Sequence, residues 1–461
     1  MVLGVARAIR RNRIALVFVV GLAVFYSTFA VERQLTFHTG GWDLGIFVQA
    51  IRNYSELKPP IVILKGPGFN LLGDHFHPIL VLLAPFYALA PTAITLLVAQ
   101  AVLFAVAAWP LVSWARTSLG RGPAVIVGLV YGLSFGIASA VGFDFHEIAF
   151  AVPLIAFSLS ALGQQRLRAA AAWALPLVLV KEDLGLSVVA VIGVLIALRG
   201  ARRLGIAVAV AGAAATALEM LVILPAVNAS GGYDYWAKLS HHPVLEVLGM
   251  SAGEKLVTLA LTIAVSGLVA LRSPMVLVAL PTLAWRFASD DANYWGTVYH
   301  YSAVLMPIMV AAMVDGVIRI RKRNRQSSRW IVPASLGVAV LFAAALLPSH
   351  SFAQFATAKF WQPNPETAAI TNALSRIPDG ATVSASDNLI PQLTSRASVT
   401  LFGLRPLASV RPQWIVVDAN STRHFVVTRA REQSDLLSAE AHGYRVAFSQ
   451  NNITLLARTA G

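Results

Sequence analysis

The sequence predicts an α-helical polytopic membrane protein with about eleven transmembrane helices and a small α/β domain at the C-terminal end. Hydrophobic residues make up 57% of the 461 residues and charged residues only 13%, whereas a soluble domain is about a quarter charged. Apolar runs of about 18–20 residues also recur along the chain, the length that crosses about 30 Å of hydrocarbon as a helix.

The net charge of +14 does not indicate binding to nucleic acid, because the Arg residues lie in short clusters between apolar runs, as positive-inside anchors do. The chain has no cysteine, which excludes disulfides, thiolate metal sites and a cysteine nucleophile. Arg7, Arg10, Arg11 and Arg13 precede an apolar run over 14–31. That run is longer than a signal-peptide core, so we expect an uncleaved first helix.

After this helix the chain is expected to enter an outer loop over residues 32–92. Inside the loop, the short apolar run 78–91 has proline at both ends and within it, and we interpret it as an interfacial helix. Ten further spans follow, and every second one ends at basic residues. The spans whose first and last residues can both be read from the sequence cover residues 93–114, 124–141, 148–162, 170–180, 204–227 and 330–347.

Charge predicts the orientation of these spans. With eleven spans and a cytoplasmic N-terminus, every Arg-rich loop falls inside. Of the fifteen acidic residues before position 350, only Asp315 falls on the cytoplasmic side and Glu219 lies within a span, while all seven histidines of this region fall outside. We therefore expect residues 1–350 to be embedded in the plasma (inner) membrane, with their ionisable chemistry at the outer face.

Residues 351–461 are expected to form a separate extracytoplasmic α/β domain. The sequence predicts helices over 365–377 and 428–441, buried strands over 381–385 and 414–418, and a hairpin of 444–448 with 453–457. This segment has no glycine-rich phosphate loop and no metal-ligand spacing. We expect it to shape the acceptor site without supplying a catalytic base.

Asp43 is the first candidate for chemistry, because it lies in the largely apolar segment 40–47 at the start of the outer loop. Leu44, Phe47 and Ile51 form a stripe at helical spacing after it. This pattern predicts a helix lying on the membrane with the carboxylate at its start. The alternative is that Asp43 only caps that helix.

Two further clusters carry metal-ligating or phosphate-binding side chains. His75 and His77 lie just before the interfacial run, and suit a divalent cation or phosphate oxygens, or form a polar turn. Asp144, His146 and Glu147 occupy a very short outer turn between two spans. Charged groups there are costly unless partnered, and their oxygen and imidazole ligands suit Mg²⁺ or Mn²⁺. The alternative is a hydrogen-bond network without a metal.

Lys181, Glu182 and Asp183 interrupt two short apolar runs. The lysine is suited to receive a phosphate and Glu182 to position it, unless the three form a self-neutralising ion cluster at a helix break. His300 begins the tenth span and is suited to donate to a phosphate, although such a histidine is often only an interfacial anchor. All these clusters are expected at one membrane surface, with Asp43 and Asp144 facing one cavity.

Five motifs carry a resemblance to a known family: GGWDLGIFVQ, GDHFHPIL, FDFHEIAF, KEDLGL and HYSAVLMP. Together they resemble the bacterial membrane protein family called domain of unknown function 2079 (DUF2079). Its layout is similar to the GT-C glycosyltransferase superfold, whose members transfer a sugar from a polyprenyl phosphate to an acceptor outside the cytoplasm. The resemblance implies that Asp43 matches the catalytic acid of the first outer loop, and Asp144, His146 and Glu147 the motif of the second.

The expected function is therefore that of a membrane glycosyltransferase. It would use a polyprenyl-phosphate-linked sugar to modify an envelope glycan, lipid or protein. Asp43 would act as the base, with Asp144, His146 and Glu147 holding a divalent cation, Mg²⁺ or Mn²⁺, or the donor phosphate. The alternatives are a transporter or flippase of lipid or polysaccharide and a non-enzymatic protein of envelope assembly. A transporter would need polar residues through the depth of the bundle.

Overall fold

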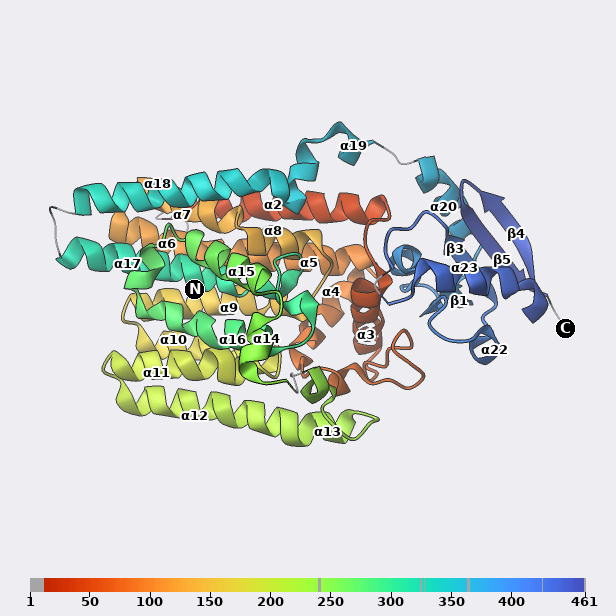
Figure 1. Cartoon of the computed structure of the whole chain (residues 1–461), viewed down its shortest axis with the longest axis horizontal. Coiled ribbons are helices and arrows are strands. Elements are labelled where there is room, and N and C mark those ends of the chain that lie inside the picture. The colour runs from red at the N-terminus through yellow and green to blue at the C-terminus, as the bar shows by residue number, and fades with distance from the viewer. Residues whose placement is uncertain are drawn as a thin grey trace.

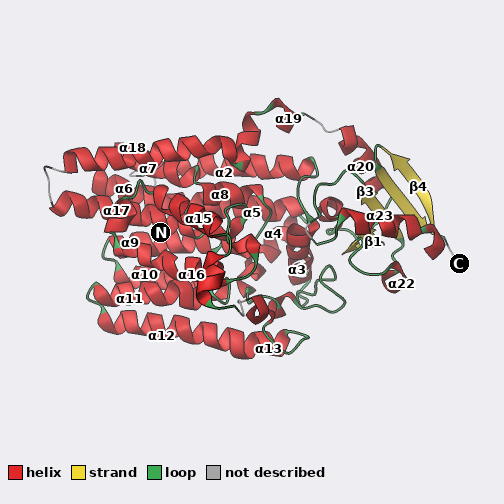
Figure 2. Cartoon of the chain, viewed as in Figure 1, coloured by secondary structure: helices red, strands yellow, loops and turns green. Residues whose placement is uncertain are grey.

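The computed structural model describes residues 12–238, 242–323, 326, 328–362, 365–424 and 426–459. The basic residues Arg7, Arg10 and Arg11 lie outside these ranges. A bundle of long helices is joined at one end to a small sheet with its own helices (Figures 1 and 2). The bundle is built from α2 (Arg13–Leu35), α5 (Ala93–Val106), α6 (Ala108–Leu119), α7 (Arg121–Gly132), α8 (Phe135–Gly142), α9 (Ala151–Gly163), α10 (Leu167–Ala174), α11 (Ala190–Leu198), α12 (Arg202–Leu218), α13 (Leu224–Val227), α14 (Val244–Gly249), α15 (Ala252–Ala264), α16 (Leu280–Ala288), α17 (Leu305–Arg323) and α18 (Ser328–Leu346).

Several of these helices are suited to cross a membrane. Among the described residues, five are long and apolar enough, and a sixth span is possible if α7 and α8, bent by 41°, count as one. Most residues in the apolar stretch of segment 300–323 are buried inside the bundle (83%), whereas only 22% are buried in the apolar stretches of 13–35, 202–227 and 329–349. Helices that expose apolar faces in this way face lipid. The protein is therefore a multi-pass membrane protein, and the count of eleven spans stays a prediction.

The first outer loop lies between the bundle and the sheet. It contains α3 (Ile46–Ser55) and, after an irregular stretch, a 3₁₀ turn (Pro78–Leu83) that continues as α4 (Ala84–Leu89). The run 78–91 is therefore helical but too short to span a bilayer. Leu82, Phe86 and Leu89 are exposed there, as expected of a helix at the membrane interface.

The C-terminal segment forms a five-stranded sheet in the order β2-β1-β3-β5-β4. Strand β1 pairs in parallel with β2 and β3, while β5 is antiparallel to both β3 and β4. Two predicted strands, the hairpin and both helices are found close to their expected positions, and β2 was not predicted. The bounds are β1 (Thr382–Ala385), β2 (Ser398–Leu401), β3 (Trp414–Asp418), β4 (Tyr444–Gln450), β5 (Ile453–Arg458), α19 (Ala358–Trp361), α20 (Pro365–Ser375), α21 (Ile390–Leu393), α22 (Leu407–Val410) and α23 (Arg429–Ser438).

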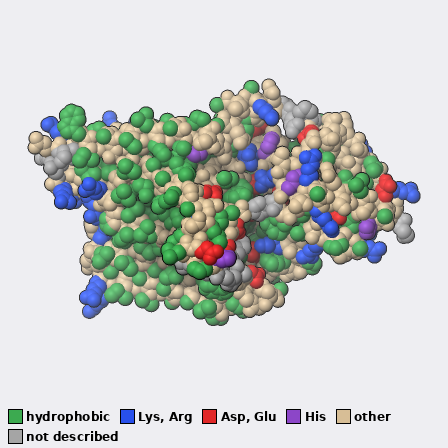
Figure 3. Space-filling view, viewed as in Figure 1, with side chains coloured by type: hydrophobic (Ala, Val, Ile, Leu, Met, Phe, Trp, Pro, Cys, Tyr) green, Lys and Arg blue, Asp and Glu red, His purple; other side chains and the backbone are tan. Residues whose placement is uncertain are grey.

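The sheet and the bundle share one hydrophobic core. Leu389, Ile390 and Leu393 belong to the same cluster of buried residues as Leu44 and Phe47 of the first outer loop. The C-terminal segment therefore packs directly on the loop that carries Asp43. Lys and Arg side chains also gather at the end of the bundle farthest from the sheet, and acidic side chains and histidines are visible nearer the sheet (Figure 3).

Candidate functional site

A cavity of about 450 Å³ lies where the bundle meets the first outer loop. It is lined by residues of the first outer loop, the turn after α8, the break before α11, the inner face of α12 and the loops at 233–236 and 289–301. Eight of the nine residues expected to carry chemistry line it: Asp43, His75, His77, His146, Glu147, Lys181, Glu182 and His300. Asp144 does not line the cavity.

Asp43 lies in a one-turn π-helix, Gly41–Gly45, that leads directly into α3. Its carboxylate is 3.4 Å from Nε2 of His146, and no side-chain cap of the π-helix or of α3 is formed. The side chain is 23% exposed, so a molecule in the cavity can reach it. Asp43 thus faces the cavity and caps neither helix.

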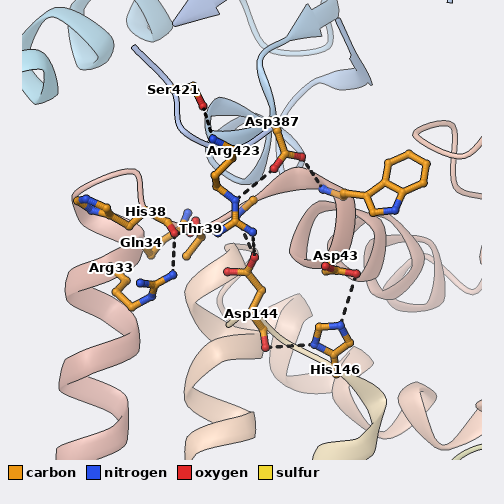
Figure 4. A network of polar contacts seen from close by, with 12 residues as sticks. Arg33, Gln34, His38, Thr39, Asp43, Asp144, His146, Asp387, Ser421 and Arg423 are labelled. Carbon is orange, nitrogen blue, oxygen red and sulfur yellow. Dashed lines mark hydrogen bonds and ion pairs between the residues drawn. The ribbon is translucent and has the colours of Figure 1, made fainter. Parts of the chain in front are cut away.

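His146 connects Asp43 to a second imidazole. Its Nδ1 is 3.4 Å from the carbonyl oxygen of Asp144 (Figure 4), so a doubly protonated ring can donate on both sides. The His300 ring stacks on it, with centroids 3.6 Å apart. Burial lowers the pKa of His146, but the neighbouring Asp43 carboxylate outweighs it and the net shift is upward. The charged form of His146 is therefore favoured beside Asp43.

Lys181 and Glu147 form a second polar group in the cavity. Lys181 Nζ is 3.1 Å from the Glu147 carboxylate, and its side chain is 17% exposed against 3% for Glu147. Burial lowers the pKa of Lys181, but the neighbouring carboxylates of Glu147, Glu182 and Asp183 raise it by more than burial lowers it. The ammonium therefore stays charged. The break between the apolar segments 167–179 and 185–198 places this cation at the edge of the bundle.

Glu182 holds the first outer loop rather than facing a ligand freely. Its carboxylate accepts hydrogen bonds from Nδ1 of His75 at 2.7 Å, the backbone N–H of Phe76 at 3.1 Å and the Tyr233 hydroxyl at 2.8 Å. Burial raises its pKa, but His75, Lys181 and a backbone hydrogen bond bring it to about 2. His77 is buried against Phe47, and burial lowers its pKa to about 4. It therefore acts as a neutral imidazole.

Asp144 is held away from the cavity by a residue of the C-terminal segment. Nη2 of Arg423 donates to Asp144 Oδ2 at 2.6 Å, and the backbone N–H of Gly40 donates to the same oxygen at 3.1 Å. The Asp144 side chain is fully buried, and burial raises its pKa to about 6 although Arg423 and Arg33 lower it. The expectation that Asp43 and Asp144 face one cavity is therefore met only by Asp43.

The predicted cation site does not fit this arrangement. Asp144, His146 and Glu147 point to three different partners: Arg423, Asp43 and Lys181. Across the described ranges, no group of three or more His, Asp or Glu side chains is placed to hold a metal ion. In this structure the three side chains form ion pairs with these partners, and we assign no step to a metal.

Aromatic residues form much of the remaining wall, and sequence reasoning did not select them. They come from the first outer loop, from 233–236 and from 285–301, where the sequence shows aromatic residues in dense succession. Flat rings next to a few charged groups are typical of pockets that bind an amphipathic or ring-shaped ligand. The aromatic residues are Trp42, Tyr233, Tyr235, Trp236, Trp285, Tyr294, Tyr299 and Tyr301.

Comparison with known proteins agrees with this layout. The model of the family described as "Predicted membrane protein (DUF2079)" matches residues 33–455. The chain belongs to this family. No curated protein matches.

Among solved structures, this DUF2079 protein is similar to ArnT from Cupriavidus metallidurans bound to undecaprenyl phosphate. The TM-score is 0.58 at 13% sequence identity, and the match covers 96% of this chain and 98% of that one. The likeness shows that the two proteins share a fold.

Proposed function

We propose that this DUF2079 protein is a glycosyltransferase that takes a sugar from a polyprenyl phosphate and transfers it to an extracytoplasmic acceptor. The observation that carries the proposal is one cavity holding both a reachable carboxylate, Asp43, and a half-buried cation, Lys181. The fold shared with a protein that binds undecaprenyl phosphate supports a polyprenyl lipid as the donor. The acceptor would be an envelope glycan, lipid or protein.

Asp43 would act as the general base. The acceptor hydroxyl oxygen bonds to the anomeric carbon of the sugar, while the bond from that carbon to the phosphate oxygen breaks. The phosphate keeps the electron pair of the broken bond, and Asp43 takes the hydroxyl proton. His146, whose Nε2 is 3.4 Å from the Asp43 carboxylate, would hold that carboxylate toward the cavity.

Lys181 would stabilise the departing phosphate. A charged ammonium fixed by Glu147 is already in place when negative charge develops on the leaving oxygen, so it needs no rearrangement during the reaction. His75, His77 and His300 would provide further hydrogen bonds to phosphate or sugar. Glu182 would keep His75 in position from behind.

We also propose that the site faces the outside. Arg166, Arg168, Arg202 and Arg203 line a shared hollow on two turns of the bundle, and arginine-rich turns are typical of the cytoplasmic side. The ionisable cavity lies at the other end of the bundle, beside the sheet. The C-terminal segment would then lie outside the cytoplasm, where it can approach an envelope acceptor.

Asp43→Asn tests the proposed base, because it removes the proton acceptor and retains the size of the side chain. We expect loss of sugar transfer from a polyprenyl-phosphate donor in a membrane-extract assay, with polyprenyl phosphate binding, read by native mass spectrometry, largely retained. Glu56→Gln removes an exposed carboxylate from the same loop and should leave transfer unchanged. Full activity of Asp43→Asn would exclude Asp43 as the base.

Lys181→Gln separates binding of the donor from the proton transfer. It removes the cation, so the same mass-spectrometric experiment should show weaker binding of polyprenyl phosphate than Asp43→Asn does. A wild-type protein that binds no polyprenyl phosphate would contradict the proposal as a whole.

A further inference from the structure

The glycines around Asp43 lie where the C-terminal segment packs closely against the first outer loop. A Cβ atom at Gly40 would come closer than 3.0 Å to the Arg423 guanidinium and to Asp387. A Cβ at Gly41 or Gly45 would come equally close to the side chain of Ile390. All three glycines of the motif therefore face side chains more than 340 positions away in the chain, and a larger residue would push the two parts apart.

Arg423 is the centre of this contact (Figure 4). Its guanidinium donates to Asp144 of the bundle at 2.6 Å, to Asp387 of the C-terminal segment at 3.3 Å and to the carbonyl oxygen of His38 at 3.0 Å. One side chain thus reaches the bundle, the C-terminal segment and the first outer loop. Its side chain is only 23% exposed.

The two carboxylates on Arg423 also hold the backbone that leads to Asp43. Asp144 accepts from the N–H of Gly40, and Asp387 accepts from the N–H of Trp42 at 2.8 Å. These N–H groups lie three and one residues before Asp43. Because both hydrogen bonds depend on carboxylates that Arg423 fixes, the guanidinium determines where the loop places Asp43.

We infer that Arg423 is a positioning residue for Asp43, so that the site is complete only when the C-terminal segment is seated on the first outer loop. The inference rests on the proposed role of Asp43, but it places a functional residue in a segment that lines no part of the cavity among the described residues. Arg423 touches neither the cavity nor the reacting atoms. It acts through Asp144, Asp387 and the loop backbone.

The test uses the full chain and a set of matched variants. Arg423→Ala removes all three contacts, and Arg423→Lys retains the charge but cannot bridge two carboxylates and a carbonyl at once. The double variant Arg423→Ala with Asp144→Asn also removes the buried carboxylate that would be left unpaired. Arg429→Ala is the control, because Arg429 is an exposed arginine of the same segment that donates to Ala419.

Positioning and folding give different results in this set. We expect Arg423→Ala to lower kcat per folded molecule by about 10- to 100-fold with little change in KM for the donor, and Arg423→Lys to recover part of it. The double variant should regain thermal stability and keep the low kcat. Loss of stability alone, or recovery of kcat in the double variant, would overturn the inference.

A readout independent of activity separates this inference from the proposed function. The chain has no cysteine, so Thr39→Cys gives a single thiol at a position that is 1% exposed. We expect maleimide to label it slowly in the otherwise unchanged chain and rapidly in the Arg423→Ala background. If labelling stays slow while Asp43→Asn abolishes transfer, the positioning role fails and the proposed function stands. If Asp43→Asn remains active, the proposed function fails whatever the labelling shows.

Discussion

At the scale of single residues, the candidate site depends on charges that neutralise one another in pairs. Asp43 lies against His146, Glu147 against Lys181 and Asp144 against Arg423. Breaking a buried pair by removing one partner costs about 3–5 kcal/mol, because the other charge is left uncompensated. In the first two pairs the more exposed member is Asp43 or Lys181, and these are the side chains that a molecule in the cavity reaches most readily.

The Asp43–His146 pair predicts a specific pH dependence. His146 has a pKa raised from 6.5 in the folded protein, so its charged form is present at lower pH and is lost as the pH rises through that raised value. Above it, His146 is neutral and its ion pair with Asp43 is lost. We therefore expect kcat to fall on the alkaline side, and His146→Gln, which cannot ionise, to lose this limb of the profile.

A pH–rate measurement between about pH 5 and 9 on both proteins checks the assignment. Asp43→Glu serves as a control, because it retains a carboxylate that can pair with His146. An alkaline limb that persists unchanged in His146→Gln would assign it to another group.

At the scale of elements, glycines show how tightly the first outer loop is held. The π-helix at 41–45 and helix α3 lie against α21, and Gly41 faces Ile390 at a distance that leaves no room for a methyl group. Sequence reasoning selected the motif for its carboxylate and predicted the helix after it. The sequence alone did not explain the glycines, because the side chain that requires them, Ile390, is distant in the chain.

Gly41→Ala should therefore destabilise the protein, by about 1–3 kcal/mol if the loop shifts to relieve the overlap. Gly21→Ala is the matched control, because Gly21 lies in α2 with nothing within 4 Å of an added Cβ, and alanine favours a helix over glycine. Thermal unfolding of the two variants in detergent checks the difference. Equal melting temperatures would show that the loop yields without cost. Shortening Ile390 to Ala should restore the Gly41→Ala variant.

At the scale of the whole molecule, periodicity and charge were sufficient to predict the class of protein. The apolar runs predicted a multi-pass helical bundle, and the tail showed alternation typical of strands. Strand β2, Ser398–Leu401, was not predicted from the sequence. Arg423 was not predicted to be functional, because an isolated arginine in a polar loop has no distinguishing pattern in the sequence. Its partners, Asp144 and Asp387, are brought beside it only by the fold.

The distribution of polar groups also bears on the alternative of a transporter. In the described part of the bundle, the polar cavity lies at the sheet end, and Asp315 pairs with Arg199 and Arg319 toward the other end. Glu219 is a buried carboxylate within the long apolar segment 202–227. The charges of Glu182 and Asp183 act on this carboxylate, so it lies near the cavity and not midway between the two polar ends. A transporter would need further polar groups between the cavity and Asp315.

The orientation of the whole chain is the last prediction, and it tests every assignment made at one face of the membrane. Because the chain has no cysteine, single cysteines at exposed positions report sidedness without background. Arg445→Cys on β4 should react with a membrane-impermeant maleimide in intact cells, whereas Arg168→Cys, on an arginine-rich turn at the other end, should react only after the membrane is opened. The reverse pattern would place the cavity in the cytoplasm, where a sugar acceptor of the cell envelope is absent, and the proposed reaction would lose its substrate.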